Sequence, residues 1–154
     1  MQRRSFLYIL CYFRNMIHPA PGILLIADPF LKDPNFLRTV VILCEHKEEG
    51  SFGFVLNKRI EQSLGELISD LEDVKLPVYY GGPVQMNTIH FLHQCPDLIP
   101  ESCKISDNIY WGGNFETVTA LIKNNCIDLT KIKFFVGYSG WGDGQLSDEL
   151  KEKS

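Results

Sequence analysis

Uninterrupted apolar runs separated by short polar segments dominate the first third of the chain. Residues 22–27 and 39–44 are apolar without alternation, which is typical of strands covered on both faces. Residues 47–51 have the composition of a hairpin loop and lead into residues 52–57, where Gly53 indicates a bulge or close packing. The pattern therefore predicts three mostly antiparallel strands at the start of the fold.

Two amphipathic helices are predicted further along the chain. Ser63 and Glu66 have the spacing of a capping box, and Asn114 has the short polar side chain of a helix cap. The apolar residues that follow at helical spacing are Leu64, Leu67, Ile68 and Leu71 in the first helix, and Phe115, Val118, Leu121 and Ile122 in the second. Each helix is expected to pack its apolar stripe against the sheet.

Extended segments surround these helices. Residues 77–80 and 88–93 are predicted strands on either side of a Gly81-Gly82-Pro83 turn, and residues 108–111 form a further short strand. Residues 132–136 are predicted to form the last strand. Because the connections are short and no long linker or repeat is present, the chain is expected to fold as one domain.

The most unusual segment is residues 137–146, which contains four glycines and two aromatic residues. Glycine is used where the backbone needs a positive φ or a close approach. The segment predicts a tight strand-to-helix turn that displays Trp141, the alternative being a purely structural corner. A last helix is expected from about Asp143, with Leu146 and Leu150 buried.

Composition indicates a soluble domain of 154 residues, 45% hydrophobic and 22% charged. The net charge of −4 gives no broad positive field, so there is no strong signal for nucleic-acid binding. The five cysteines are scattered, odd in number and without CxxC spacing, which favours reduced thiols in the cytoplasm.

The N-terminal residues 1–15 loosely resemble a signal peptide. Arg14 and Asn15 interrupt the apolar segment, which is too short to cross a bilayer, so no membrane span is predicted. Residues 1–15 are interpreted as a non-native or disordered extension upstream of Met16, and residues 16–154 as the single domain. An amphipathic membrane anchor is the alternative.

A set of motifs in order along the chain resembles the AlgH/YqgE-like family over residues 21–154. The motifs are residues 22–27, Phe36 with Arg38, residues 40–46, 53–57 and 81–84, Leu92-His93, and residues 137–142. The resemblance implies an α+β fold, in which a strongly bent, mostly antiparallel sheet is partly closed like a barrel and surrounded by short helices. It carries a transcriptional-regulator label without a recognisable DNA-reading module.

Two departures from the family pattern concern the C-terminal part. Asp143 stands where the family usually has proline, and either residue suits a helix start. The chain stops at Ser154, whereas family members usually continue, so the domain is expected to lack a C-terminal element. Apolar surface beside Leu146 and Leu150 would then favour self-association.

Several polar residues have side chains suited to metal binding or catalysis. Adjacent Glu45 and His46 are expected on opposite faces of a strand, as are His90 and His93, so no metal site and no cofactor are predicted. Cys44 and His46 are two residues apart and would share a face, which leaves a small hydrolase or thiol enzyme as one hypothesis.

The leading hypothesis is a ligand-binding or regulatory protein whose partner is an unknown small ligand or protein. Its cleft is expected to contain Arg38, Glu45, His46, Asn57, Gly81, Gly82, Tyr138, Trp141 and Gln145, because polar and glycine motifs gather at strand ends. Structural alternatives remain: Arg38 would pair with Asp28, Asp33 or Glu45, Asn57 would cap a strand end, and Gly81-Gly82 would form a turn. DNA-binding regulation rests on the family label alone.

Overall fold

The computed structural model describes residues 6–9, 19–27 and 38–151. Its strands are β1 (Phe6–Ile9), β2 (Leu24–Ala27), β3 (Val40–Lys47), β4 (Gly50–Val55), β5 (Arg59–Ser63), β6 (Pro77–Tyr80), β7 (Val84–His93), β8 (Cys103–Ser106), β9 (Ile109–Trp111) and β10 (Ile132–Trp141). The helices are α1 (Leu64–Leu67), α2 (Phe115–Lys123) and α3 (Gln145–Lys151), with short 3₁₀ turns η2 (Ser69–Leu71) and η3 (Leu129–Lys131).

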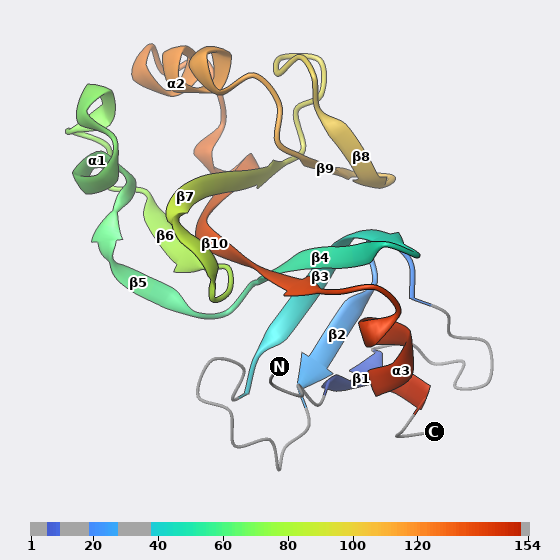
Figure 1. Ribbon diagram of the computed structural model, residues 1–154. Helices are drawn as coiled ribbons and strands as arrows, with labels where there is room; N and C mark the ends of the chain where they lie inside the picture. The colour runs from blue at the N-terminus through green and yellow to red at the C-terminus, as the bar shows by residue number, and fades with distance from the viewer. Residues whose placement is uncertain (1–5, 10–18, 28–37, 152–154) are drawn as a thin grey trace.

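Strand β10 joins the two halves of the sheet (Figure 1). Its first part pairs parallel to β6 and antiparallel to β7, and its last three residues pair antiparallel to β4. On one side the order continues from β4 to β3, β2 and β1, and on the other from β7 to β9 and β8. The result is a bent, mostly antiparallel sheet with few short helices, which confirms the expected α+β fold.

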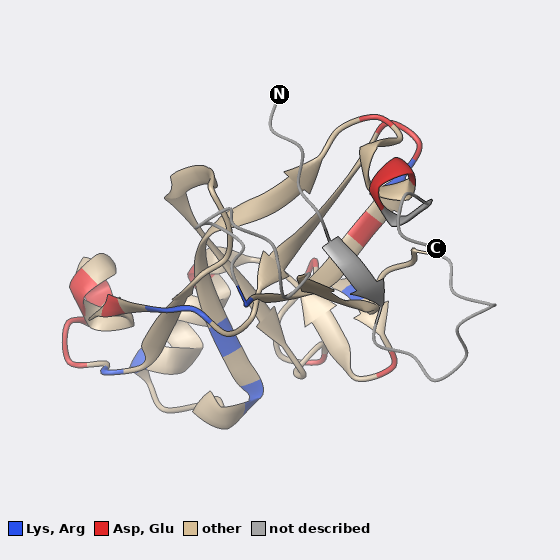
Figure 2. Ribbon diagram, turned by 90° about the horizontal axis from the view of Figure 1, so that it is seen from below, with Lys and Arg blue, Asp and Glu red and all other residues tan. Residues whose placement is uncertain are grey.

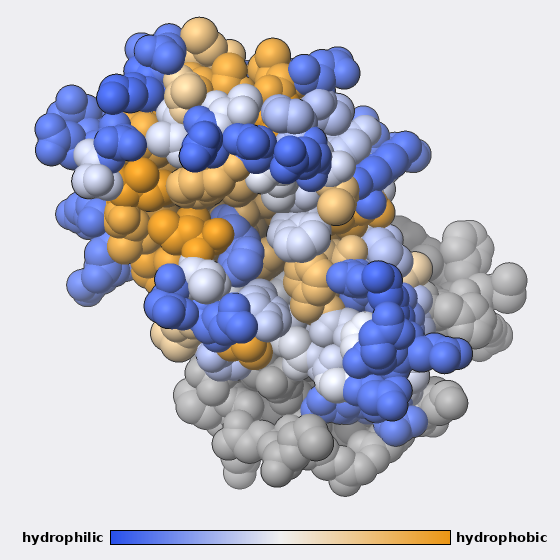
Figure 3. Space-filling model, turned by 45° about the horizontal axis from the view of Figure 1, so that its top comes forward, coloured by the Kyte–Doolittle hydropathy of each residue, from blue (hydrophilic) through white to orange (hydrophobic). Residues whose placement is uncertain are grey.

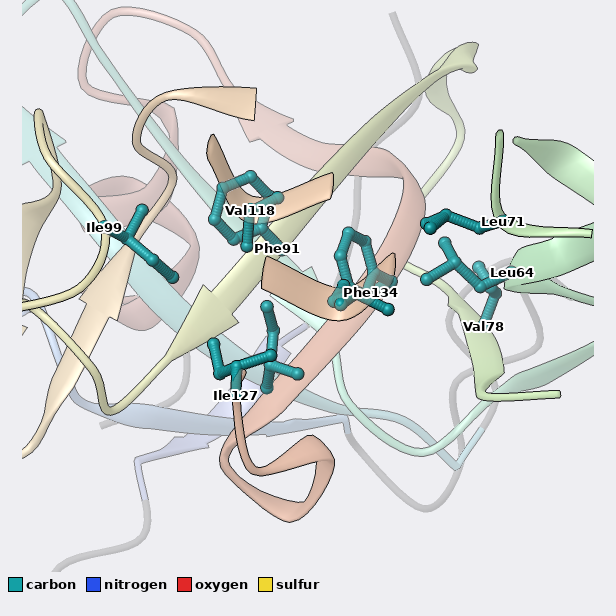
Figure 4. Close-up of a cluster of buried hydrophobic side chains, with 10 residues drawn as sticks. Leu64, Leu71, Val78, Phe91, Ile99, Val118, Ile127 and Phe134 are labelled. Atoms are coloured by element: carbon teal, nitrogen blue, oxygen red, sulfur yellow. The ribbon is translucent and has the colours of Figure 1, made fainter. Parts of the chain in front are cut away.

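Three apolar clusters fill the faces of this sheet. The inner cluster lies between the two halves and contains Ile42, Cys44, Phe54, Leu92, Ile105 and Phe135. A second cluster lies under α1 and α2 (Figure 4), where Phe91 and Phe134 from the sheet pack with Val118 from α2. The third lies under α3, where Leu146 packs with Leu25 and Val41. Strands β3 and β10 thus have buried residues on both faces, as expected for strands whose apolar runs do not alternate.

Most predicted elements are confirmed. The capping box of Ser63 and Glu66 starts α1, and the Asn114 side chain accepts a hydrogen bond from the Thr117 amide at 2.9 Å at the start of α2. Strands β5 and β8 were not predicted, since Arg59–Ser63 is mainly polar and Cys103–Ser106 is short. Strands β6 and β7 lie on either side of the Gly81-Gly82 turn as predicted, and each of them pairs with β10.

Residues 137–141 differ from the expected strand-to-helix turn. They continue β10, and Trp141 is only 3% exposed, with its indole N–H donating to the Glu149 carboxylate at 3.2 Å. The indole is buried because Trp141 ends a strand whose outer face is covered by α3. Helix α3 buries Leu146, which is 1% exposed, so this residue does not form bare surface; the Leu150 side chain lies outside the described residues.

The two ends of the chain leave some predictions open. Within the expected extension 1–15 the structure describes only Phe6–Ile9, which pair antiparallel with β2 as strand β1. Self-association and the nature of residues 1–15 stay predictions. In the described part of the chain, no helix is both long and apolar enough to cross a membrane.

Apolar side chains also reach the surface between hydrophilic ones (Figure 3). Among the described residues, the large apolar side chains that are more than one-third exposed are Leu67, Met86, Leu98, Phe115 and Leu129. They come from separate elements along the chain, which is ordinary for a globular surface.

Gly53 generates the first testable prediction. A Cβ at this position would lie 2.2 Å from the Ile42 carbonyl oxygen, beside the register shift that places Cys44 as an extra residue in β3. The expected bulge and close packing are therefore both present. Gly53→Ala should lower the free energy of unfolding by about 3 kcal/mol, because backbone atoms must move apart. Chemical denaturation measures this change.

Gly142→Ala is the matched control. Its added Cβ would meet only the Gln145 side chain, at 3.8 Å, so the unfolding free energy should change by less than about 1 kcal/mol. Equal effects of the two substitutions would show that the close packing of β3 and β4 does not constrain the fold.

Candidate functional site

A hollow of about 550 Å³ opens at one side of the inner cluster. Its residues come from the β3–β4 hairpin, from β7, from the end of β9 and from the last part of β10. They are Glu45, Lys47, Glu49, Gly50, Ser51, Phe52, Phe54, Val84, His90, Trp111, Tyr138, Gly140 and Trp141. We call this hollow the aromatic cleft, and its volume is in the range of small-molecule sites.

Aromatic rings form most of the cleft wall. The Phe52 ring centroid lies 4.8 Å from that of Trp111 and 6.0 Å from that of Tyr138, both in edge-to-face arrangements. These three side chains are only partly buried, so their rings contact both the inner cluster and the hollow. The wall therefore offers aromatic surface to a planar ligand.

His90 stands beside these rings and is held in its neutral form. Its ring lies 5.8 Å from Tyr138 and 5.5 Å from Phe54, and burial lowers the pKa of His90 below its ordinary value. The Thr88 hydroxyl donates to the Gln85 carbonyl at 2.7 Å, so the 2.9 Å contact between His90 Nε2 and this hydroxyl requires an Nε2–H donor. The neutral ring then keeps Nδ1 as an acceptor.

Carboxylates dominate the rim of the cleft. Glu45 is 37% exposed and its carboxylate forms an ion pair with Lys47 at 2.6 Å. The hydrogen bond and the charge of Glu45 raise the pKa of Lys47. Glu49 lies on the same rim, so the two carboxylates outnumber the single lysine there, and the rim disfavours an anion.

His46 and Gln145 lie away from this cleft. His46 lines a neighbouring polar hollow beside α3, and its Nδ1 lies 2.6 Å from the Ser51 hydroxyl. As predicted, Glu45 and His46 point to different hollows. Gln145 accepts from the Gly142 amide at 2.9 Å and donates to Glu149 at 3.3 Å, so it caps the start of α3.

Arg38 and Asn57 are at the other end of the β3–β4 pair. Asn57 accepts from the Val40 amide and donates to the Arg38 carbonyl, both at 2.9 Å, which is the strand-capping role. Arg38 is exposed and has a left-handed backbone with φ 54°. Its expected partners Asp28 and Asp33 lie outside the described residues. Six residues of mainly extended chain lie between Arg38 and Glu45 and place them roughly 20 Å apart.

Gly81 and Gly82 are buried and join strands instead of offering amides to a ligand. The Gly81 amide donates to the Val136 carbonyl, and its own carbonyl accepts from the Val55 amide, both at 2.8 Å. A Cβ on Gly82 would lie 2.3 Å from the Tyr138 backbone. Of the nine predicted site residues, the cleft contains Glu45, Tyr138 and Trp141.

Cys44 is unsuited to nucleophilic chemistry. It lies in the inner cluster, and burial together with the Glu45 charge raises its thiol pKa far above the ordinary range. The bulge between Leu43 and Glu45 resets the alternation of side chains along β3. Cys44 and His46 therefore lie on different faces, and the prediction that they share one is wrong. Among the described residues, no group of three or more His, Cys, Asp or Glu side chains is placed to hold a metal.

Sequence reasoning missed Phe52, Trp111 and Val84 as cleft residues. Phe52 and Phe54 are two residues apart in β4, and Trp111 is the last residue of β9. Aromatic residues in strands usually pack in the hydrophobic core, so these positions gave no signal for a binding site. The pairing of β10 with both β4 and β7 brings these strands together, and no local pattern predicts that pairing.

Comparison with known proteins gives consistent results. The sequence profile of the AlgH-like family matches residues 24–154. The chain is 46% identical over 134 residues to a UPF0301 protein of Chlorobium limicola, covering 87% of this chain and 72% of that protein. It is 43% identical over 142 residues to a UPF0301 protein of Parabacteroides distasonis, with coverages of 91% and 72%.

Two solved structures are similar in fold. The solution structure of the AlgH protein from Pseudomonas aeruginosa matches with a TM-score of 0.67 and 31% identity, over 84% of this chain and 71% of that one. A crystal structure of a Corynebacterium diphtheriae protein matches with a TM-score of 0.73 and 22% identity, over 92% and 78%. These names state no ligand or activity, so the regulatory role implied by the resemblance stays a prediction.

Thiol labelling tests the environment of Cys44. Cys103 and Cys126 are exposed and should react with an aromatic disulfide reagent in the native protein, whereas Cys44 should react only after denaturation, because its thiol is buried and protonated. Mass spectrometry of labelled peptides identifies the reacting residues. Fast native labelling of Cys44 would restore the thiol-enzyme hypothesis.

The titration of His90 gives a second check. Its folded pKa should lie below the ordinary 6.5, so the unfolded chain binds the proton more readily. The contribution of His90 to stability is therefore present above pH 6.5 and is lost as the pH falls from there through the folded pKa. Two-dimensional NMR of the ring C–H groups measures the midpoint, and a midpoint at or above 6.5 contradicts the neutral, half-buried ring.

Proposed function

Since this chain belongs to the AlgH-like family, we propose that it is a ligand-binding protein of that family and that the aromatic cleft binds its ligand. The observation that carries the proposal is the clustering of Phe52, Trp111 and Tyr138 around a hollow whose rim holds Glu45. The buried, protonated thiol of Cys44 disfavours the alternative of a thiol enzyme.

The ligand is a small molecule with a planar ring and a cationic or hydrogen-bond-donating group. Aromatic faces attract cations and stack on planar rings. The cleft also offers hydrogen-bond acceptors to a donor group of the ligand. They are the carboxylates of Glu45 and Glu49 and the Nδ1 atom of His90. Among the described lining residues, the basic side chain that could neutralise the charge of an anionic ligand is Lys47, and Lys47 is already paired with Glu45.

A pair of planar probes of opposite charge tests this proposal. Tryptamine and indole-3-propionate share an indole ring but carry an amine and a carboxylate respectively. Tryptamine should bind more tightly and shift the backbone NMR signals of Phe52, His90, Trp111 and Tyr138. Trp111→Leu should weaken tryptamine binding by about tenfold through loss of ring contact, and Glu45→Gln by about threefold, since this carboxylate is partly exposed.

Lys104→Gln is the control, because Lys104 is exposed on β8, forms an ion pair with nearby Asp107 at 3.9 Å and lies outside the cleft. It should leave tryptamine binding unchanged. Equal affinity for the two indole probes, or signal changes away from the four cleft residues, would contradict the proposal.

A further inference from the structure

A second hollow opens on the other side of the inner cluster and shares no residue with the aromatic cleft. It also has a volume of about 550 Å³. Its lining comes from β2, β3, the residue after β4, β6, the end of β7, β9, η3 and the start of β10. We call it the lysine-rimmed groove.

The floor of this groove is apolar. Ile42 and Leu92 are buried members of the inner cluster, and Leu56, Tyr79 and Ile109 pack against them while remaining partly exposed. The phenylalanines Phe54 and Phe135 stack at 4.8 Å in the same cluster, and Phe54 also lines the aromatic cleft. The inner cluster thus separates two hollows whose floors it forms.

The polar groups of the floor are satisfied internally. His93 is buried, its Nε2 contacts the Gly112 carbonyl and the Ser102 hydroxyl at 3.0 Å, and its Nδ1 accepts from the Cys95 amide at 3.0 Å. The Thr130 hydroxyl donates to Asp128 at 2.7 Å. These side chains shape the groove, and the two lysines are the charged groups among its lining residues.

Lys133 is the distinctive group of the groove. Its ammonium nitrogen lies 3.9 Å from the centroid of the Tyr79 ring, on the groove wall. Burial lowers the pKa of Lys133, and no carboxylate of the described residues forms an ion pair with it. A half-buried ammonium group without a carboxylate partner has lost part of its hydration, so an ion pair with an anionic ligand would stabilise its charged form.

Lys131 adds a second positive charge at the same end. It is exposed at the end of η3. The nearby Asp128 accepts hydrogen bonds from the amide and the hydroxyl of Thr130 through Oδ1, and the charge of Lys131 also helps to lower the pKa of Asp128. Viewed from below, most basic segments (blue) lie on one half of the molecule, where acidic segments (red) also occur, and further acidic segments mark the β3–β4 hairpin and α3 on the other half (Figure 2). The lining residues themselves give the rims opposite charge, with two lysines in the groove and two carboxylates against one lysine in the cleft.

We propose that the lysine-rimmed groove is a second ligand site, for a small amphiphile with an anionic head and an unbranched apolar tail, of the medium-chain carboxylate class. The head pairs with Lys133 and Lys131, and the tail covers Leu56, Tyr79 and Ile109 on the floor. This site is independent of the proposed function, because no lining residue is shared and the charge preference is opposite.

Decanoate, used below its micelle concentration, is the probe, and decyltrimethylammonium is the matched cation. Isothermal titration calorimetry should show binding of decanoate and at least tenfold weaker binding of the cation. In NMR spectra, decanoate should shift the backbone signals of Leu56, Tyr79, Ile109 and Lys133. Equal binding of both amphiphiles, no decanoate binding, or shifts confined to the aromatic cleft would each overturn the proposal.

Three lysine variants sharpen the result. Lys133→Met keeps an unbranched side chain without the charge and should weaken decanoate binding by about tenfold, as for loss of a charge-assisted hydrogen bond. Lys133→Arg should retain binding within about threefold because the charge remains. Lys104→Met, remote from the groove, should leave binding unchanged. If Lys133→Met binds decanoate as tightly as the original chain, the assignment of the head-group site is wrong.

Discussion

The whole architecture depends on the close backbone contact between Gly81-Gly82 and Gly137-Tyr138. At Gly137 the strand has a φ of 70° and its register with β7 shifts, and a Cβ there would lie 2.4 Å from the Gly82 carbonyl oxygen. This kink moves β10 from its pairing with β6 to its pairing with β4. The Ser139 hydroxyl, which donates to the Gly81 carbonyl at 3.0 Å, fixes the contact. One strand can therefore hold both halves of the sheet.

The two hollows follow from that bend. Because the halves of the sheet are inclined toward each other, their inner faces share one apolar cluster that fills the middle and leaves a hollow on each side. Different strand ends supply the two rims. The β3–β4 hairpin brings carboxylates to the aromatic cleft, and η3 and the start of β10 bring one lysine each to the groove. A single fold constraint thus creates two chemically different surfaces.

The predictions from sequence succeeded where the signal was local. The caps at Ser63 and Asn114 and the apolar runs of β2 and β3 depend on neighbouring residues, and the structure confirms them. The glycine-rich segment after residue 136 was recognised as a special backbone. Gly137 serves close strand-to-strand contact, whereas Gly142 and Gly144 lie in the turn between β10 and α3. The predicted gathering of Arg38 with Glu45 was wrong on local grounds, because the two residues flank one predicted strand and so lie at its opposite ends. The side chain of Asn57, which follows β4, caps the end of the strand pair near Arg38. The cleft aromatics required knowledge of long-range pairing, which no short window contains.

The pairing of β10 also has a consequence for how the chain acquires its structure during synthesis. It is the last strand of the described chain, yet β4, β6 and β7 all pair with it, and its partners in β4 are separated from it by more than half of the sequence. Until β10 leaves the ribosome, β4, β6 and β7 each have an edge with unpaired amide and carbonyl groups, flanked by apolar side chains. Non-local pairing of this kind folds slowly, because the loop-closure entropy is lost before the contacts form. The nascent chain therefore passes through a period in which it is a natural client for chaperones that shield exposed strands.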